Sequence, residues 1–216
     1  MRKGLLKKFD TFIFDWDGTL TKMKFYMAVY HDFDIIMKYR RTQSLKGASK
    51  KPDFDSMAYL KKYEHRLSIE KNALSYLANI PMLVVRPRLQ EGAAAVLERL
   101  RSEKKNIALV TNALPFRAAR EIARLGIEEY FDVIFSTRTT HAIKPNPLGI
   151  NAVLHALKAN RQKTIYMGDM VDDVVAAKLA KVHSCAIANG FDTKEVLMES
   201  DPEYVFNNME EFRKAL

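Results

Sequence analysis

Hydrophobic positions follow two different patterns along this chain. From residue 86 onward, short apolar runs alternate with stretches in which apolar residues recur every three or four positions. The first pattern is typical of buried strands and the second of amphipathic helices. Residues 22–85 show only the helical spacing, and they follow an apolar run that ends at Phe14. We therefore expect an α/β fold, a parallel sheet with helices on both faces, and a helical insertion after the first strand.

The expected elements alternate regularly outside the insertion. Strands are predicted at residues 9–14, 107–110, 133–135, 164–167 and 185–188, and helices at 93–100, 115–125, 147–159 and 174–180. No Pro/Gly-rich linker marks a boundary, because the whole chain has 7 Pro and 8 Gly. The change in pattern predicts a core domain of residues 1–21 and 86–216 and a small inserted domain of residues 22–85.

The positive charge is concentrated in the predicted insertion. The formal net charge is +9, and residues 22–88 hold fourteen basic and six acidic side chains, whereas residues 89–216 hold seventeen of each. A basic segment can bind nucleic acid, an anionic membrane surface or an anionic substrate. It can equally be a solvated surface, which is the commoner case.

Composition and apolar run lengths favour a cytoplasmic protein. The single cysteine, Cys185, has no partner for an internal disulfide and lies in an apolar run. The apolar run before Asp15 is too short for a signal peptide, and no stretch is long enough to span a bilayer. We therefore expect no membrane association.

Polar residues that can do chemistry follow several of the predicted strands. Asp15-Trp16-Asp17-Gly18-Thr19 follows the first strand, Thr111-Asn112 the second, and Gly168-Asp169 a later one. Lys144-Pro145 lies in a loop between a strand and a helix. Each of these segments alone is ordinary turn chemistry. Ligands of an open parallel sheet, however, bind beyond the carboxyl ends of its strands, so all four segments are expected to meet at one edge.

The four segments, in this order, resemble the four motifs of the haloacid dehalogenase superfamily. The resemblance covers nearly the whole chain, including Gly190-Phe191 and residues 202–206 near the C-terminus. It implies a Rossmann-like core, and the insertion resembles the C1-type helical cap of phosphoglycolate-phosphatase-like members. The implied activity is that of a Mg²⁺-dependent phosphatase that hydrolyses a small phosphate monoester through an aspartyl-phosphate intermediate.

The residue types suit phosphoryl transfer without reference to the family. Asp15 can act as the nucleophile, which splits one difficult step into two. Asp17 can protonate the leaving oxygen and then deprotonate the attacking water. Thr111 and the backbone N–H of Asn112 can bind the phosphoryl oxygens, and Lys144 can neutralise their charge.

Clustered carboxylates imply a bound cation. Asp15 and Asp169, with the backbone carbonyl of Asp17, offer the oxygen ligands that Mg²⁺ prefers. Asp173 lies one helical turn after Asp169, where it can face the same ion or order its waters. Spacing does not divide the roles between Asp172 and Asp173, but the resemblance favours Asp173 as the functional member.

Two other functions remain open at this point. Phosphomutases share these motifs with phosphatases, because fold and motifs do not fix function. A nucleic-acid-binding or anion-binding protein with an inactive core would use the basic insertion, although no strip of aromatic residues interleaved with arginines supports RNA binding.

The substrate is expected to be a small anionic phosphorylated metabolite. If Arg40 and Arg41 overhang the site, they would favour a leaving group with its own negative charge. The chain departs from the family pattern at Lys181, where relatives usually have glycine, and this is expected to affect only a helix terminus. Oligomeric state is not encoded in these patterns.

Overall fold

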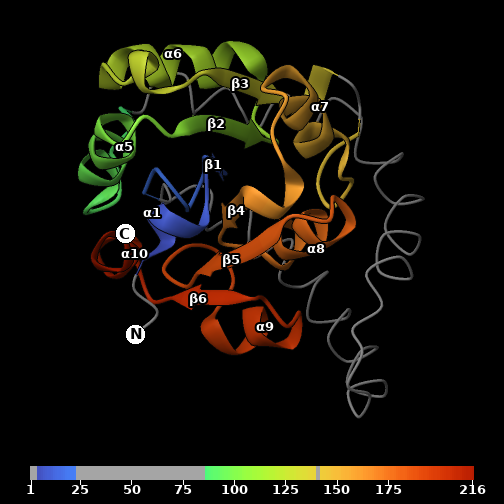
Figure 1. Ribbon diagram of the computed structural model, residues 1–216. Helices are drawn as coiled ribbons and strands as arrows, with labels where there is room; N and C mark the ends of the chain where they lie inside the picture. Colours follow the sequence, from blue (N-terminus) through green and yellow to red (C-terminus); the bar gives the residue numbers. More distant parts are fainter. Residues whose placement is uncertain (1–3, 23–85, 140–141) are drawn as a thin grey trace.

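A six-stranded parallel sheet forms the centre of the molecule in the computed structural model, which describes residues 4–22, 86–139 and 142–216 (Figure 1). The strand order is β3-β2-β1-β4-β5-β6, and every neighbouring pair is parallel. The strands are β1 (Thr11–Phe14), β2 (Asn106–Thr111), β3 (Val133–Ser136), β4 (Thr164–Gly168), β5 (His183–Ile187) and β6 (Tyr204–Phe206). The α/β class and the parallel sheet predicted from the sequence are thereby confirmed.

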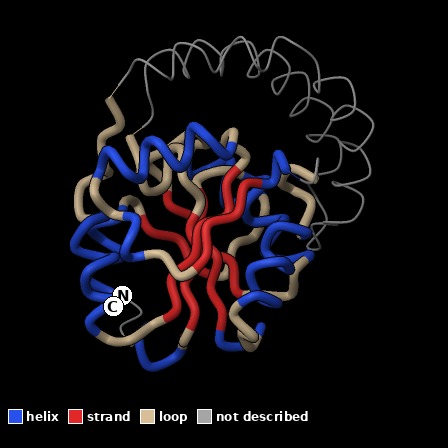
Figure 2. The backbone as a smooth tube through the Cα atoms, turned by 90° about the horizontal axis from the view of Figure 1, so that it is seen from above, coloured by secondary structure: helices blue, strands red, loops and turns tan. Residues whose placement is uncertain are grey.

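Helices cover both faces of this sheet (Figure 2). One hydrophobic core joins alternate strand residues to α1 (Leu5–Lys8), α5 (Ala93–Ser102), α6 (Pro115–Leu125) and α10 (Met209–Ala215). The other strand residues pack against α7 (Leu148–Ala156) and α8 (Val171–Leu179), while α9 (Lys194–Glu199) contacts α8. Short 3₁₀ turns, η2 (Glu128–Tyr130), η3 (Thr137–Thr139) and η4 (Arg161–Lys163), complete the described elements. This two-faced burial explains why the strands are continuous apolar runs in the sequence.

Local signals in the sequence set the ends of several helices. Helix α6 begins at Pro115, whose fixed φ suits the first helical position, and ends before Gly126, which has a φ of 64°. The predicted bounds of this helix are confirmed. Lys181, at a position where glycine was expected, has a φ of 57° directly after α8. The departure at Lys181 therefore falls at a helix terminus, as expected, and the positive φ costs some backbone strain there.

Several element boundaries differ from the sequence prediction. Helix α8 begins at Val171 and not at residue 174, because Asp173 accepts backbone N–H groups at its first turn. Helix α7 ends at Ala156, three residues early, and the following turn places Lys158 at a φ of 49°. The first strand begins at Thr11, since Leu5–Lys8 form the short helix α1.

The two chain segments that flank the predicted insertion lie side by side. Thr21 pairs with Leu89 in an antiparallel bridge, and the Lys22 amide donates to the Arg88 carbonyl. The proposed boundaries of the inserted domain, its cap-like helices and the hypothesis on Arg40 and Arg41 concern residues 23–85, which lie outside the described part. Within the described part, none of the helices has the length and hydrophobicity that a membrane crossing requires.

Candidate active site

The predicted chemical residues gather at the carboxyl ends of three adjacent strands, β2, β1 and β4. Asp15 follows the last residue of β1, and its amide donates to the Met167 carbonyl of β4 at 2.8 Å. Thr111 is the last residue of β2, and Asp169 follows β4 directly. The sheet therefore brings these predicted segments to one edge, as their order in the sequence indicated.

Lys144 links Asp15 to Asp173. Its Nζ atom donates to Asp15 Oδ1 in a short ion pair and to Asp173 Oδ1 at 2.7 Å. All three residues are buried, with exposed fractions of 5%, 5% and 1% for Asp15, Lys144 and Asp173. Tyr166, on β4, also donates to Asp173 Oδ1, at 3.0 Å. One buried ammonium group thus ties the candidate nucleophile to helix α8.

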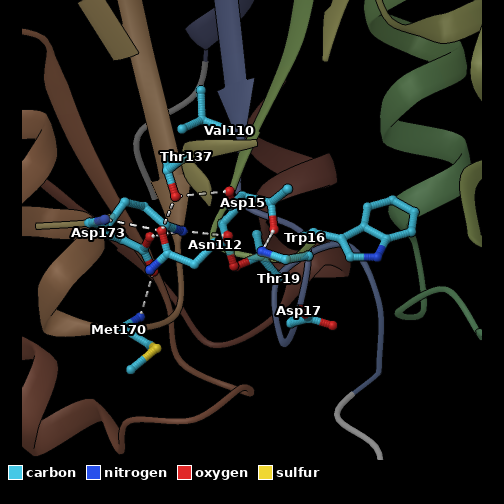
Figure 3. A network of polar contacts seen from close by, with 12 residues as sticks. Asp15, Trp16, Asp17, Thr19, Val110, Asn112, Thr137, Met170 and Asp173 are labelled. Atoms are coloured by element: carbon cyan, nitrogen blue, oxygen red, sulfur yellow. Dashed lines mark hydrogen bonds and ion pairs between the residues drawn. The ribbon is translucent and has the colours of Figure 1, made fainter. Parts of the chain in front are cut away.

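Asp173 has both carboxylate oxygens occupied. Its Oδ2 atom accepts the backbone N–H groups of Asp169 and Met170 at 3.1 and 3.0 Å, as Figure 3 shows in part. Its Oδ1 atom accepts from Lys144 and Tyr166. These four contacts fix Lys144 beside Asp15. Asp172, the neighbouring carboxylate on the first turn of α8, is only partly buried.

Asp169 is fully buried, and both of its carboxylate oxygens accept hydrogen bonds. Thr19 donates to its Oδ1 at 2.9 Å, and the Phe191 amide donates to its Oδ2 at 2.7 Å. Gly18 and Gly190 leave the room for this carboxylate, since a Cβ at either position would lie 2.1 or 2.0 Å from Asp169 Oδ2. Gly18 also has a φ of 84°, which favours glycine. Both glycines are therefore needed to hold the side chain in place.

The electrostatics of this cluster favour a bound cation. Carboxylate oxygens of Asp15, Asp169 and Asp173 lie within 4.8 Å of one another. Burial raises the pKa of Asp15 to about 7, the Lys144 ammonium opposes that rise, and the Asp173 carboxylate adds to it. Burial also raises the pKa of Asp169 well above its usual value, and the Asp15 and Asp173 charges raise it further. Three buried carboxylates beside one lysine suit a divalent, oxygen-ligated cation, which lowers their mutual repulsion. We call Asp15, Lys144, Asp169 and Asp173 the Lys144 cluster.

The Lys144 ammonium stays charged in this setting. Burial alone lowers the pKa of a lysine, but the carboxylates of Asp15 and Asp173 outweigh it, so the pKa of Lys144 is raised well above its usual value. A permanent cation beside Asp15 can neutralise a phosphoryl group as it arrives.

Thr111 and Asn112 have different roles in the structure. The Thr111 hydroxyl oxygen accepts the Ala113 amide at 3.0 Å, which leaves its O–H to donate elsewhere. The Asn112 side chain accepts from the Thr137 hydroxyl at 2.7 Å and from the Lys144 amide at 3.0 Å. Asn112 therefore anchors the loop that carries Lys144, a contact that the sequence pattern did not indicate.

Asp17 makes a separate ion pair with helix α6. Its two carboxylate oxygens accept from the guanidinium of Arg117, one in a short contact and the other at 3.0 Å. Arg117 also contacts Glu121 at 3.5 Å, and Glu121 accepts the Trp16 indole N–H at 2.8 Å. Figure 3 shows the Trp16 indole and the Asp173 carboxylate on opposite sides of Asp15. Trp16 thus points away from Asp173 and the Lys144 side of the site. We call Trp16, Asp17, Arg117 and Glu121 the Arg117 cluster.

Three residues of the site were missed in the sequence. Arg117 and Glu121 lie four positions apart on a helix. This spacing is as common for exposed ion pairs as for buried ones, so it does not indicate a site. Tyr166 lies within an apolar strand, where an aromatic residue predicts core packing. Only the fold reveals that these three side chains are buried beside the carboxylates.

Comparison with known proteins gives the family. Residues 12–187 match the family model described as haloacid dehalogenase-like hydrolase. A protein named pyrophosphatase PpaX from Halalkalibacterium halodurans is 28% identical over 55% of this chain, and a phosphoglycolate phosphatase from Neisseria meningitidis is 26% identical over 68%. The chain spans 55% of the length of the first of these relatives and 64% of the second. A pyrophosphatase PpaX from Listeria welshimeri is 23% identical, with 94% of each chain covered.

Solved structures show the same fold. A HAD-superfamily hydrolase from Ehrlichia chaffeensis superposes with a TM-score of 0.59 at 20% identity, covering 99% of this chain and 96% of the other. A haloacid dehalogenase-like family protein from Streptococcus pneumoniae gives a TM-score of 0.61 at 19% identity, with 95% and 97% covered. The family model matches most of the chain, and the four predicted segments lie at one sheet edge, so this chain belongs to the haloacid dehalogenase-like hydrolase family.

Proposed function

We propose that the protein is a Mg²⁺-dependent phosphatase that hydrolyses small phosphate monoesters through an aspartyl phosphate on Asp15. The observation that carries this proposal is the position of Asp15: it directly follows β1 within the Lys144 cluster and is ion-paired to Lys144. A nucleophilic carboxylate, a fixed cation and further carboxylates for a metal are the parts that phosphoryl transfer requires.

In the first step, an oxygen of Asp15 attacks phosphorus as the bond between phosphorus and the ester oxygen breaks. Lys144 balances charge on the phosphoryl group, and the Thr111 hydroxyl donates to one of its oxygens. Asp17 gives its proton to the leaving oxygen, so that an alcohol departs.

In the second step, water attacks the phosphorus of the aspartyl phosphate. The Asp17 carboxylate takes a proton from that water, and the bond between phosphorus and Asp15 breaks. Orthophosphate leaves, Asp15 is again a carboxylate, and Asp17 is again protonated. The two steps therefore consume one water and return both aspartates to their starting state.

Asp15 and Asp169, with the backbone carbonyl of Asp17, would hold Mg²⁺. When bound, the ion supplies charge neutralisation for the carboxylates and for the phosphoryl group. Asp173, whose oxygens accept four donors, orients Lys144 and the start of α8. We assign it this orienting role near the metal.

Two names among the relatives, phosphoglycolate phosphatase and pyrophosphatase, suggest the substrate class. Phosphoglycolate and pyrophosphate both carry negative charge on the group that leaves. We propose a small anionic phosphorylated metabolite as the substrate, in keeping with the net charge of +9.

Phosphate release from p-nitrophenyl phosphate, phosphoglycolate and pyrophosphate tests the proposal. We expect turnover of at least one of them with Mg²⁺ and little in EDTA, and a loss of about 10³-fold or more in Asp15→Asn. Acid quenching with ³²P-labelled substrate should leave label on the wild type and none on Asp15→Asn. Undiminished turnover in Asp15→Asn would overturn the mechanism.

A further inference from the structure

The Arg117 cluster places a buried arginine between Asp17 and a second carboxylate. The side chains of Arg117 and Glu121 are each 3% exposed, whereas that of Asp17 is 16% exposed. Arg117 and Glu121 come from the same face of α6, one turn apart. Asp17 comes from the loop after β1, two residues from the nucleophile. The cluster therefore joins helix α6 to the loop that bears the acid/base residue.

Arg117 holds Asp17 by both carboxylate oxygens. The terminal nitrogens of a guanidinium form a planar fork that matches a carboxylate, so this contact fixes the direction of the side chain as well as its place. An acid must present an oxygen to the leaving group within hydrogen-bond reach. Asp17 must therefore free one oxygen from Arg117 and take up a proton from water before it can protonate a leaving oxygen.

Glu121 gives Arg117 a carboxylate neighbour during that movement. The same guanidinium nitrogen that binds Asp17 Oδ1 lies 3.5 Å from Glu121 Oε2. A buried guanidinium that lost its carboxylate altogether would carry a large desolvation penalty. Because Glu121 is already beside it, the exchange needs only a small shift of the arginine. Trp16, which donates to Glu121, keeps that carboxylate in place.

We propose that Arg117 is a positioning residue for Asp17: as Arg117 shifts toward Glu121, it frees one Asp17 oxygen for the leaving group and keeps its contact with the other, which fixes the direction of the acid. The inference rests on the proposed phosphatase function and adds a residue that acts through the acid/base group. It has a specific consequence: loss of Arg117 should harm esters that need a protonated leaving group and spare those that do not.

The experiment compares two aryl esters with different leaving groups. p-Nitrophenolate departs readily without a proton, whereas phenolate gains more from acid catalysis. The readout is the ratio of kcat/KM for p-nitrophenyl phosphate to that for phenyl phosphate, with Mg²⁺ present. In Asp17→Asn this ratio should rise on the order of 100-fold. In Arg117→Met it should rise about tenfold, and in Arg117→Lys, which keeps the charge without the fork, about threefold.

Three controls separate positioning from a structural role. Adding Arg117→Met to Asp17→Asn should leave the ratio at the value of Asp17→Asn alone, since Arg117 acts through Asp17. Arg120→Met, an exposed arginine on the same helix, should leave the ratio unchanged. Glu121→Gln should raise the ratio a few-fold, because Arg117 then has a weaker second acceptor.

Two results would overturn the inference. If Arg117→Met lowers kcat/KM for both esters by the same factor, Arg117 only supports the fold. If Arg117→Met does not fold, an unchanged ratio in both Arg117→Lys and Glu121→Gln gives the same answer. Failure of the proposed function gives a different result, because the Asp15→Asn variant would then turn over substrate as fast as the wild type does.

Discussion

The two sides of the candidate site bury carboxylates in opposite ways. In the Lys144 cluster, two of three carboxylates contact one lysine, and oxygens of all three carboxylates lie within 4.8 Å of one another. In the Arg117 cluster, two carboxylates contact one arginine, and an indole N–H supports one of them. The first arrangement carries two more negative charges than positive charges, and the second carries one.

The difference in net charge indicates what each side of the site can bind or hold. An excess of buried negative charge is costly, and a divalent cation offsets it directly. A nearly balanced pair has no such need, but it can hold a carboxylate in a chosen direction. We therefore expect the Lys144 cluster to respond to metal and the Arg117 cluster to respond to the leaving group.

Replacing Lys144 by methionine should have the largest effect on stability. The variant keeps the length of the side chain but leaves Asp15 and Asp173 without the cation that both contact. Breaking a buried pair in this way costs about 3–5 kcal/mol. Urea unfolding in EDTA measures the loss, and turnover of p-nitrophenyl phosphate should fall with it.

Lys178→Met is the matched control on α8. Lys178 pairs with Asp201, whose side chain is 86% exposed, so the change should stay within about 1 kcal/mol. An equal loss in both variants would contradict the view that the buried carboxylates depend on Lys144.

Metal should stabilise the protein through the carboxylates of the Lys144 cluster and not through the side chains of the Arg117 cluster. At a Mg²⁺ concentration about 100 times its Kd, binding adds about 2.7 kcal/mol to the free energy of unfolding. Thermal unfolding with and without Mg²⁺ should show this shift in the wild type and in Glu121→Gln, and should lose it in Asp169→Asn. If the Mg²⁺-dependent shift in unfolding temperature persists in Asp169→Asn and disappears in Glu121→Gln, the metal depends on the Arg117 cluster and not on the Lys144 cluster.

The sequence predicted the sheet well because strands buried on both faces leave continuous apolar runs. The residues that follow those runs, Asp15, Thr111 and Asp169, could be placed at one edge because parallel strands share a direction. Helix α6 was predicted to its ends by Pro115 and Gly126. These signals are local, because each can be recognised within a short stretch of sequence.

Contacts between distant side chains could not be predicted in the same way. Arg117 and Asp17 are 100 positions apart, and the spacing of Arg117 to Glu121 is that of any helical ion pair. The role of Tyr166 depends on the direction of its side chain from β4, because the Tyr166 hydroxyl lies beside Asp173 in the fold. Burial decides all three cases, and burial of a charged residue is set by the whole fold.

The choice between Asp172 and Asp173 gives the smallest expected effect and the sharpest internal control. Asp173 receives four donors on two oxygens, whereas an asparagine at this position has one acceptor oxygen and an NH₂ group. Either Lys144 and Tyr166 or the two backbone amides would then face another donor. Asp173→Asn should therefore lower the free energy of unfolding by about 2 kcal/mol.

Asp172→Asn makes the same chemical change one residue earlier on the same helical turn. Asp172 is partly exposed and lies in the first turn of α8, where a carboxylate charge typically contributes about 0.3–1 kcal/mol. We expect turnover to fall about tenfold or more in Asp173→Asn, because Lys144 loses the anchor that keeps it beside Asp15, and to change little in Asp172→Asn. If turnover in Asp173→Asn falls as little as in Asp172→Asn, the position of Lys144 does not depend on Asp173, and the contact of its backbone with Asn112 is enough to hold it.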